Sequence, residues 1–277
     1  MNINKTIQIG RETLLKGGID PREARFLLAF VMNIKNEELL KYRECSEEQY
    51  NKYLEVINRR IKKEPFAYIV EHKEFMKLDF KVNEKVLIPR ADTEILVQEI
   101  INMCCNTGED NKFRILDMCT GSGCIAVSLA KYINNAEIIA VDISEDALIV
   151  AKENAEKNQV NIEFIHSNLF ERLSVSTKFD IIVSNPPYIK SNVIVELQDE
   201  VKREPYLALD GGETGVEFYR NIINEAYKFL KINGILAFEI GFDQALEVVS
   251  IMKQHDYKEI NIIKDYGGND RVVIGKK

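Results

Sequence analysis

The chain has 277 residues, of which 45% are hydrophobic and 29% charged, and its net charge is −7. This composition suits a globular protein of one large or two modest domains, and it argues against a disordered chain or a protein whose main partner is a polyanion. We expect a cytoplasmic protein, because no run of 18 apolar residues suggests a membrane span and the N-terminus has no apolar signal segment. Five cysteines without a Cys-x-x-Cys pair and three histidines far apart in sequence predict no metal site.

The first 70 or so residues have the pattern of helices only. A helix is expected from Asp20, an N-cap residue followed by proline, and a second from Ser46, which has Gln49 three residues later. Residues 1–73 hold 14 Lys+Arg and 11 Asp+Glu, a net charge of +3 against −10 for the remainder. They are predicted to form an N-terminal helical domain. Four basic residues near the end of the second helix are interpreted as a solvated face, with contact to a partner as the alternative: Arg59, Arg60, Lys62 and Lys63.

The partial alternation of residues 74–90 predicts a β-hairpin that links two domains, and a helix is expected to begin near Asp92 or Thr93. From about residue 113, short apolar strands alternate with helices, which is typical of a parallel sheet covered on both faces. The last two strands of the chain are expected to form an antiparallel pair. We therefore predict an α/β fold for residues 91–277, with a Rossmann-like, mostly parallel sheet that ends in an antiparallel hairpin.

Residues 117–126, DMCTGSGCIA, form a glycine turn between a predicted strand and a predicted helix. Gly121 and Gly123 have no Cβ, so the backbone there is able to approach a ligand closely. Asp142 ends the next strand, where a carboxylate suits hydrogen bonds to ribose hydroxyls. Because the pattern is neither G-x-G-x-x-G nor a phosphate loop, an adenosine ligand without phosphates is favoured over a dinucleotide or ATP. The alternative is a tight strand-to-helix connection with no ligand.

A second loop, HSNLFE at residues 166–171, follows the third predicted strand. Asn168 is placed to hydrogen-bond an adenine edge, and Leu169 and Phe170 are placed to cover the ring. An ordinary loop with two core anchors is equally compatible with this composition.

The stretch IIVSNPPYIK, residues 181–190, places an amide and two prolines directly after an apolar strand. Proline cannot donate to a sheet ladder, so the strand is expected to stop at Asn185, and ligands bind at that end of the strands in open α/β sheets. The Asn185 side-chain oxygen and a backbone carbonyl, predicted to be that of Pro186, would accept both N–H bonds of a planar NH₂ group. This favours the transition state in which the nitrogen lone pair turns toward an electrophile, while Tyr188 walls the pocket. The alternative is a rigid proline turn with no chemistry.

Taken together, SNPPYI (184–189), the DMCTGSGCIA loop and IPRADTE (88–94) resemble the HemK/PrmC family of release-factor glutamine methyltransferases. EPYLALDGGETGVEFYRNII (204–223) and FEIG (238–241) followed by Gln244 match it as well. The resemblance implies the S-adenosylmethionine-dependent methyltransferase fold, with S-adenosylmethionine as methyl donor and S-adenosylhomocysteine as product. It also implies methylation of the side-chain amide nitrogen of glutamine in the Gly-Gly-Gln motif of peptide chain release factors.

By residue match, the resemblance implies two sets of site residues. The donor would be held by Cys119, Thr120, Gly121, Ser122, Gly123, Asp142, Asn168, Leu169 and Asn185. The glutamine would be held by Asn185, Pro186, Pro187 and Tyr188, of which Asn185, Pro186 and Tyr188 would be catalytic. Three positions depart from the family pattern: Cys119 and Glu71 stand where glycine is common, and Asn168 where aspartate is common.

A nucleic-acid methyltransferase acting on the exocyclic amine of adenine or guanine is the alternative function, because such enzymes carry similar Asn-Pro-Pro-Tyr motifs. The acidic second part of the chain and the lack of a separate basic domain count against it. A non-catalytic S-adenosylmethionine-binding module is a third possibility, against which the intact motif argues. We therefore expect release factors as partners, docked by residues 1–73, with no stable nucleic-acid partner and no membrane association.

Overall fold

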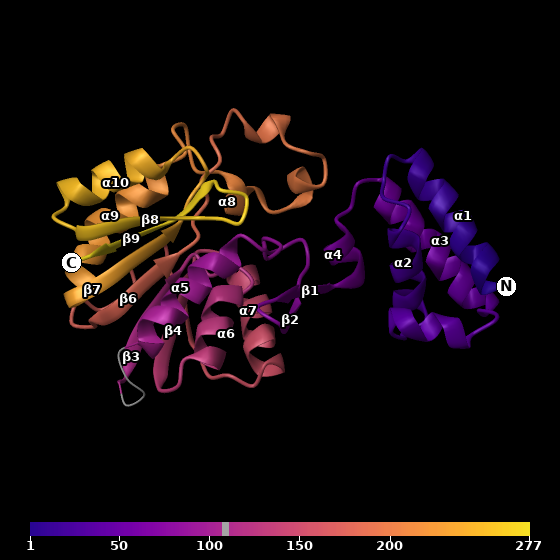
Figure 1. Cartoon of the computed structure of the whole chain (residues 1–277), viewed down its shortest axis with the longest axis horizontal. Helices are drawn as coiled ribbons and strands as arrows, with labels where there is room; N and C mark the ends of the chain where they lie inside the picture. The colour runs from indigo at the N-terminus through magenta and orange to yellow at the C-terminus, as the bar shows by residue number, and fades with distance from the viewer. Residues whose placement is uncertain (107–110) are drawn as a thin grey trace. The chain divides into compact units, whose positions relative to one another are not determined.

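The structure of the chain, a computed structural model, describes residues 1–106 and 111–277 (Figure 1). These residues divide into two units, each with its own apolar core. The first unit comprises Met1–Glu71 together with Gln198–Arg203, and the second comprises His72–Leu197 and Glu204–Lys277. No helix of the described ranges is long and apolar enough to cross a membrane.

The first unit consists of helices. They are α1 (Ile3–Lys16), α2 (Glu23–Val31), the 3₁₀ turn η1 (Asn36–Lys41), α3 (Glu47–Ile61), α4 (Phe66–Val70) and the 3₁₀ turn η3 (Val201–Arg203). The predicted capping box of α3 is confirmed, because the Ser46 and Gln49 side chains each accept the other residue's backbone N–H. Helix α2 begins later than predicted, at Glu23. The Asp20 carboxylate accepts the backbone N–H of Arg22 and caps a turn that precedes the helix.

The interpretation of the basic residues on α3 as a solvated face is wrong for Arg60, which is only 4% exposed. Its guanidinium donates to the carboxylates of Glu23 (2.5 Å) and Glu200 (2.8 Å). Arg60 lies one turn beyond the buried Ile57, so its apolar stem continues the core face of α3 while its charged head is paired. Arg59 remains half exposed and pairs with Glu64.

The second unit contains, within the described ranges, a two-stranded and a seven-stranded sheet (Figure 1). The strands of the large sheet lie in the order β5-β4-β3-β6-β7-β9-β8. Its members are β3 (Phe113–Met118), β4 (Ala136–Asp142), β5 (Glu163–His166), β6 (Phe179–Ser184), β7 (Leu230–Glu239), β8 (Lys258–Lys264) and β9 (Asp270–Lys276). Among the described pairs of this large sheet, only those that involve β9 are antiparallel. The predicted mostly parallel sheet with a C-terminal antiparallel hairpin is thereby confirmed.

Helices cover both faces of the large sheet. They are α5 (Thr93–Cys105), α6 (Cys124–Tyr132), α7 (Glu145–Lys157), α9 (Glu217–Phe229) and α10 (Ala245–Gln254). Ile181 and Val183 of β6 share a core with α5 and α6, whereas Ile182 shares a core with α9 and α10. This alternation is the period of two expected for a strand buried on both sides.

The predicted hairpin is present but shorter than expected, with β1 (His72–Phe75) paired to β2 (Leu78–Lys81). The side chain of Asn154 on α7 accepts the backbone N–H of Lys81 and donates to its carbonyl, so the hairpin edge is tied to α7. Two short elements complete the second unit, η2 (Ile194–Glu196) and α8 (Tyr206–Leu209).

Candidate active site

A cavity of about 200 Å³ opens at the carboxyl ends of β3, β4 and β6. Its walls include most of the residues expected to bind the donor and the glutamine, namely Cys119, Thr120, Gly121, Ser122, Asp142, Asn168, Leu169, Asn185 and Pro187. Among the described residues, the walls do not include Gly123, Pro186 or Tyr188. The apolar side chains of Leu207 and Phe218 and the cation of Arg90 also line it.

The glycine loop turns from β3 into α6 with three residues in the left-handed region. Gly121 has a φ of +55° and Gly123 a φ of +79°. A Cβ on Gly123 would lie 3.0 Å from the Cβ of Ala151 on α7, so this glycine is required for close helix packing as well as for the turn. Cys119 has a φ of +64°, a conformation that is strained for a residue with a Cβ.

Two carboxylates hold this loop, those of the buried Asp117 and the partly buried Asp142. Oδ2 of Asp117, a fully buried residue of β3, accepts the Thr120 hydroxyl (2.6 Å) and the backbone N–H of Ala126 (3.1 Å). Burial raises the pKa of Asp117 to about 7, and these hydrogen bonds oppose the shift. Sequence reasoning missed Asp117, although an acidic residue inside an otherwise apolar strand was the available signal.

Asp142 lies at the end of β4, where the sequence placed it. Its Oδ2 accepts the backbone N–H of Gly121 (2.8 Å), and its Oδ1 accepts that of Ser144 (2.9 Å). Burial raises the pKa of Asp142, and these backbone hydrogen bonds counteract the shift. A carboxylate oxygen accepts more than one hydrogen bond, so Asp142 has capacity left for a ligand in the cavity.

One residue of the loop after β5 is anchored in the apolar core, and others line the cavity. Leu169 lines the cavity, but Phe170 is buried and stacks on Phe229 of α9 with ring centroids 4.8 Å apart. Phe170 therefore does not cover a ligand ring, contrary to the expected placement. Asn168 also lines the cavity and donates from Nδ2 to Glu171 (2.7 Å).

Asn185 follows directly after β6, which ends at Ser184. Its Nδ2 donates to the Thr93 hydroxyl at the start of α5 (3.3 Å), which leaves Oδ1 as the acceptor that the amide offers to the cavity. Sequence reasoning named Thr93 as a possible helix start and as part of the IPRADTE motif, but gave it no role in the site. Thr93 lies 92 residues from Asn185 in sequence, so no local pattern links the two.

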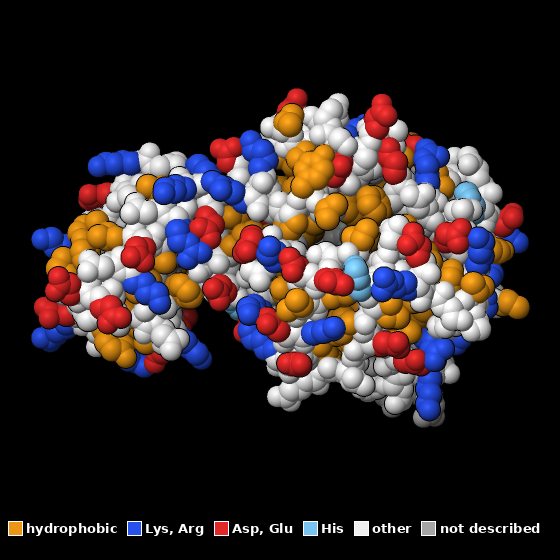
Figure 2. Space-filling model, turned by 180° about the vertical axis from the view of Figure 1, so that it is seen from behind, with side chains coloured by type: hydrophobic (Ala, Val, Ile, Leu, Met, Phe, Trp, Pro, Cys, Tyr) orange, Lys and Arg blue, Asp and Glu red, His pale blue; other side chains and the backbone are white. Residues whose placement is uncertain are grey.

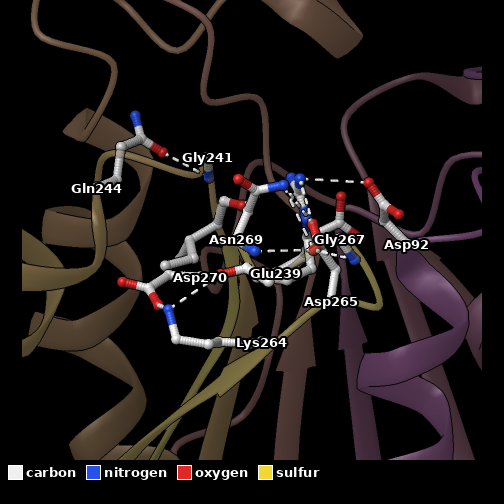
Figure 3. Close-up of polar contacts among 12 residues, drawn as sticks. Asp92, Glu239, Gly241, Gln244, Lys264, Asp265, Gly267, Asn269 and Asp270 are labelled. Carbon is white, nitrogen blue, oxygen red and sulfur yellow. Dashed lines mark hydrogen bonds and ion pairs between the residues drawn. The ribbon is translucent and has the colours of Figure 1, made fainter.

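The turn that contains Tyr188 is fixed from two sides. Gln244 donates from Nε2 to the carbonyl of Tyr188 (3.0 Å) and accepts the backbone N–H of Gly241 (2.9 Å), a contact visible in Figure 3. On the other side, a Cβ on Gly211 would lie 2.6 Å from the Cα of Tyr188. These contacts explain why Gly211, in the EPYLALDGGETGVEFYRNII motif, and Gln244, after the FEIG motif, accompany the Asn-Pro-Pro-Tyr motif.

Glu239, the last residue of β7, lies beneath this turn and is only 1% exposed. The Tyr188 hydroxyl donates to its Oε1 (3.3 Å). Burial raises the pKa of Glu239 to about 7, while the Thr93 hydroxyl and the Arg271 cation lower it. Arg271 is itself 3.2 Å from the carboxylates of Asp92 and Asp265 (Figure 3).

A further ion pair joins two of the motifs. Glu204 of the EPYLAL motif is buried, and it accepts the guanidinium of Arg90 and the backbone N–H of Ile88 (3.0 Å). The segment that carries Arg90 into the cavity wall is thereby fixed. In the described ranges, no group of three or more His, Cys, Asp or Glu residues could hold a metal ion.

Comparison with known proteins shows two family matches. Residues 91–203 match the methyltransferase small domain, and residues 6–70 match the PrmC N-terminal domain. Among solved structures, a methyltransferase from Pyrococcus furiosus has a TM-score of 0.54 at 20% identity, over 74% of this chain and 91% of that one. A 16S rRNA methyltransferase from Thermus thermophilus has a TM-score of 0.52 at 16% identity, over 74% and 49%. These likenesses confirm the methyltransferase fold.

Two curated relatives are similar over most of the chain. A protein of Fusobacterium nucleatum named release factor glutamine methyltransferase is 43% identical over 96% of this chain and 76% of its own length. A protein of the same name from Clostridium acetobutylicum is 42% identical over 91% of this chain and 90% of its own length. The resemblance found in the sequence motifs is thereby confirmed, and the chain belongs to the release factor glutamine methyltransferase family.

Proposed function

We propose that this enzyme transfers a methyl group from S-adenosylmethionine to the side-chain amide nitrogen of the glutamine in the Gly-Gly-Gln motif of peptide chain release factors. The observation that carries the proposal is the Asn185 amide, which offers an oxygen acceptor to the same cavity that the glycine loop and Asp142 line. The names of the relatives support the same substrate class.

The cavity suits the donor chemically. The donor supplies a methyl group made electrophilic by its bond to a sulfonium sulfur. We propose that Asp142 and residues 119–123 hold its adenosine part, and that Asn168 and Leu169 lie near its adenine. The Asp142 oxygens already fix the loop through backbone N–H groups, so the loop and the carboxylate are positioned before a ligand arrives.

The other side of the cavity suits a planar amide. An amide nitrogen is a poor nucleophile because its lone pair is delocalised into the carbonyl. We propose that Asn185 Oδ1 and the carbonyl of Pro186 accept its two N–H bonds, with Pro187 and Tyr188 completing the pocket. Held in this way, the nitrogen lone pair faces the methyl group. As the new N–C bond forms, the sulfonium S–CH₃ bond breaks and S-adenosylhomocysteine is the leaving group, and one amide N–H proton is lost to solvent.

We further propose that residues 1–73 dock the release factor. The buried Arg60 is committed to Glu23 and Glu200 and is a poor candidate for that contact. The exposed Phe26 (48%) and Phe30 (36%) suit it better, because they lie one turn apart on α2. Exposed aromatic side chains are enriched where proteins bind proteins.

The deciding experiment offers labelled donor to release factor, RNA and DNA in parallel. We expect label in the glutamine of the release factor, located by mass spectrometry, and little label in a free Gly-Gly-Gln peptide, which lacks remote contacts. The face drawn in Figure 2 mixes acidic and basic side chains, which does not favour a nucleic-acid surface. Label only in nucleic acid would overturn the proposal.

Docking is tested in the full chain with Phe26→Ser and Phe30→Ser combined. We expect a raised KM for release factor and an unchanged affinity for the donor. The matched control is Leu246→Ser, which removes an apolar side chain, 82% exposed, from α10. An unchanged KM in the double variant would refute docking through α2.

A further inference from the structure

The short helix α8 presents two exposed apolar side chains at the mouth of the cavity. Leu207 lines the cavity and is nonetheless 68% exposed, so its side chain lies where the cavity opens to solvent. Tyr206, the residue before it, is 55% exposed. Pro205 and Ala208 line the cavity as well, so α8 forms part of its rim. A single exposed apolar side chain is common on protein surfaces, but two of them beside a binding cavity indicate a contact surface.

Both ends of α8 are fixed within the second unit. Before the helix, the buried Glu204 accepts the guanidinium of Arg90 and the backbone N–H of Ile88 (3.0 Å). At its end, the carbonyl of Leu209 accepts the backbone N–H of Ile189 (3.1 Å). The exposed side chains are therefore held in place before a partner arrives, which reduces the conformational entropy that binding would cost.

The position of α8 places it beside the turn that we propose holds the glutamine. Ile189, which bonds to the end of α8, directly follows the Asn-Pro-Pro-Tyr turn. Figure 1 shows α8 beyond the carboxyl ends of β6 and β7. A glutamine side chain spans only roughly 5 Å from its Cα to its amide nitrogen. With that nitrogen at Asn185, the backbone of the substrate has to lie at the mouth of the cavity, and the flanking residues have to pass over its rim.

The apolar character of this rim suits the motif that carries the glutamine. The two preceding glycines have no side chains and offer a partner only their peptide planes and Cα hydrogens. A tyrosine ring and a leucine side chain bury such a backbone through apolar contact, and a tyrosine loses few rotamers in doing so. An exposed tyrosine also stacks on nucleobases, so a base is the competing occupant that an experiment has to separate.

We propose that Tyr206 and Leu207 bind the segment of the release factor that carries the Gly-Gly-Gln motif, and that this contact positions the glutamine at Asn185. The inference rests on the proposed function and deepens it. It assigns a contact surface next to the reacting residue, whereas the docking proposed for Phe26 and Phe30 concerns parts of the release factor remote from the glutamine.

Photo-crosslinking tests this contact without turnover. The photoreactive amino acid p-benzoylphenylalanine is placed at position 206 of the full chain, and the protein is irradiated with release factor and S-adenosylhomocysteine. We expect a crosslink, located by mass spectrometry, in the release-factor peptide that contains the Gly-Gly-Gln motif. The matched control carries the same group at position 232, because Ile232 is 87% exposed near the amino end of β7, at the opposite edge of the sheet. The control should give no crosslink to that peptide.

Kinetics on release factor measure what the contact contributes. Tyr206→Ser and Leu207→Ser should each raise the KM by roughly 5- to 30-fold, the usual effect of truncating a side chain that is important for binding at an interface. Tyr206→Phe should keep the KM within about twofold of the wild type, because the ring makes the contact. Tyr206 is not among the described residues that line the cavity, so in Tyr206→Ser the donor affinity should stay within about threefold by calorimetry. Ile232→Ser should leave the KM unchanged.

The outcomes separate this inference from the proposed function. If the wild type methylates release factor but position 206 gives no crosslink to the Gly-Gly-Gln peptide, the inference is overturned and the proposed function stands. An unchanged KM in both serine variants would overturn it in the same way. If the wild type methylates only RNA or DNA and position 206 crosslinks to a base, both fail. If Leu207→Ser no longer binds the donor, the KM of Tyr206→Ser and the crosslink from position 206 still decide the inference.

Discussion

Replacing Asn185 with alanine removes the side-chain acceptor that the proposed mechanism assigns to the glutamine amide. The loss concerns a preorganised hydrogen bond in a partly buried site, and the amide is held by Thr93 before substrate binds. Loss of one such group costs about 3–4 kcal/mol in the transition state, which corresponds to a kcat lower by roughly 100- to 1,000-fold.

The donor should bind Asn185→Ala nearly as well as it binds the wild type, because Asp142 and the glycine loop are untouched. The assay is single-turnover methyl transfer to release factor, with donor affinity measured by calorimetry on the same preparation. Asn224→Ala, an exposed position on α9, is the matched control. Transfer within about fivefold of the wild type, or loss of donor binding as severe as loss of activity, would refute the reasoning.

Three further predictions concern the loop that we propose holds the donor. Asp142→Ala should weaken donor binding by about 1.5–3 kcal/mol, measured by calorimetry, because charge-assisted hydrogen bonds are lost. Cys119→Gly should raise the free energy of unfolding by up to about 1 kcal/mol in urea, since glycine accepts a φ of +64° without strain. Folded Asp117, with a pKa of about 7, keeps a proton that the unfolded chain releases near pH 4, so the free energy of unfolding should fall as pH rises from about 4 to 7. Asp117→Asn should reduce this fall, and an unchanged slope would contradict the assignment.

Local patterns were sufficient to predict the elements. The short apolar strands expected from about residue 113 include β3 and β4, because a strand buried on both faces has a nearly continuous apolar sequence. Ser46 was predicted to start a helix, and its side chain accepts a backbone N–H in the first turn of α3. These features depend on neighbours within a few residues.

The contacts that orient the site could not be predicted in the same way. Thr93 and Asn185 lie 92 residues apart, and Tyr188 and Glu239 lie 51 residues apart, so their spacing in sequence has no period that would mark these contacts. The burial of Arg60 could not be predicted for the same reason, because one of its carboxylate partners, Glu200, lies 140 residues away in sequence. A pattern of charges along one helix does not contain that information.

The sheet topology explains why the proposed donor and acceptor sites lie together. Strands β3, β4 and β6 are neighbours and run parallel, so the glycine loop, Asp142 and Asn185 all follow carboxyl ends at one edge of the sheet. The buried carboxylates at that edge, Asp117 and Glu239, contact hydroxyls and backbone groups and do not line the cavity among the described residues. The proposed mechanism relies on acceptors of fixed orientation more than on a base, and the Thr93 hydroxyl holds the Asn185 amide in such an orientation.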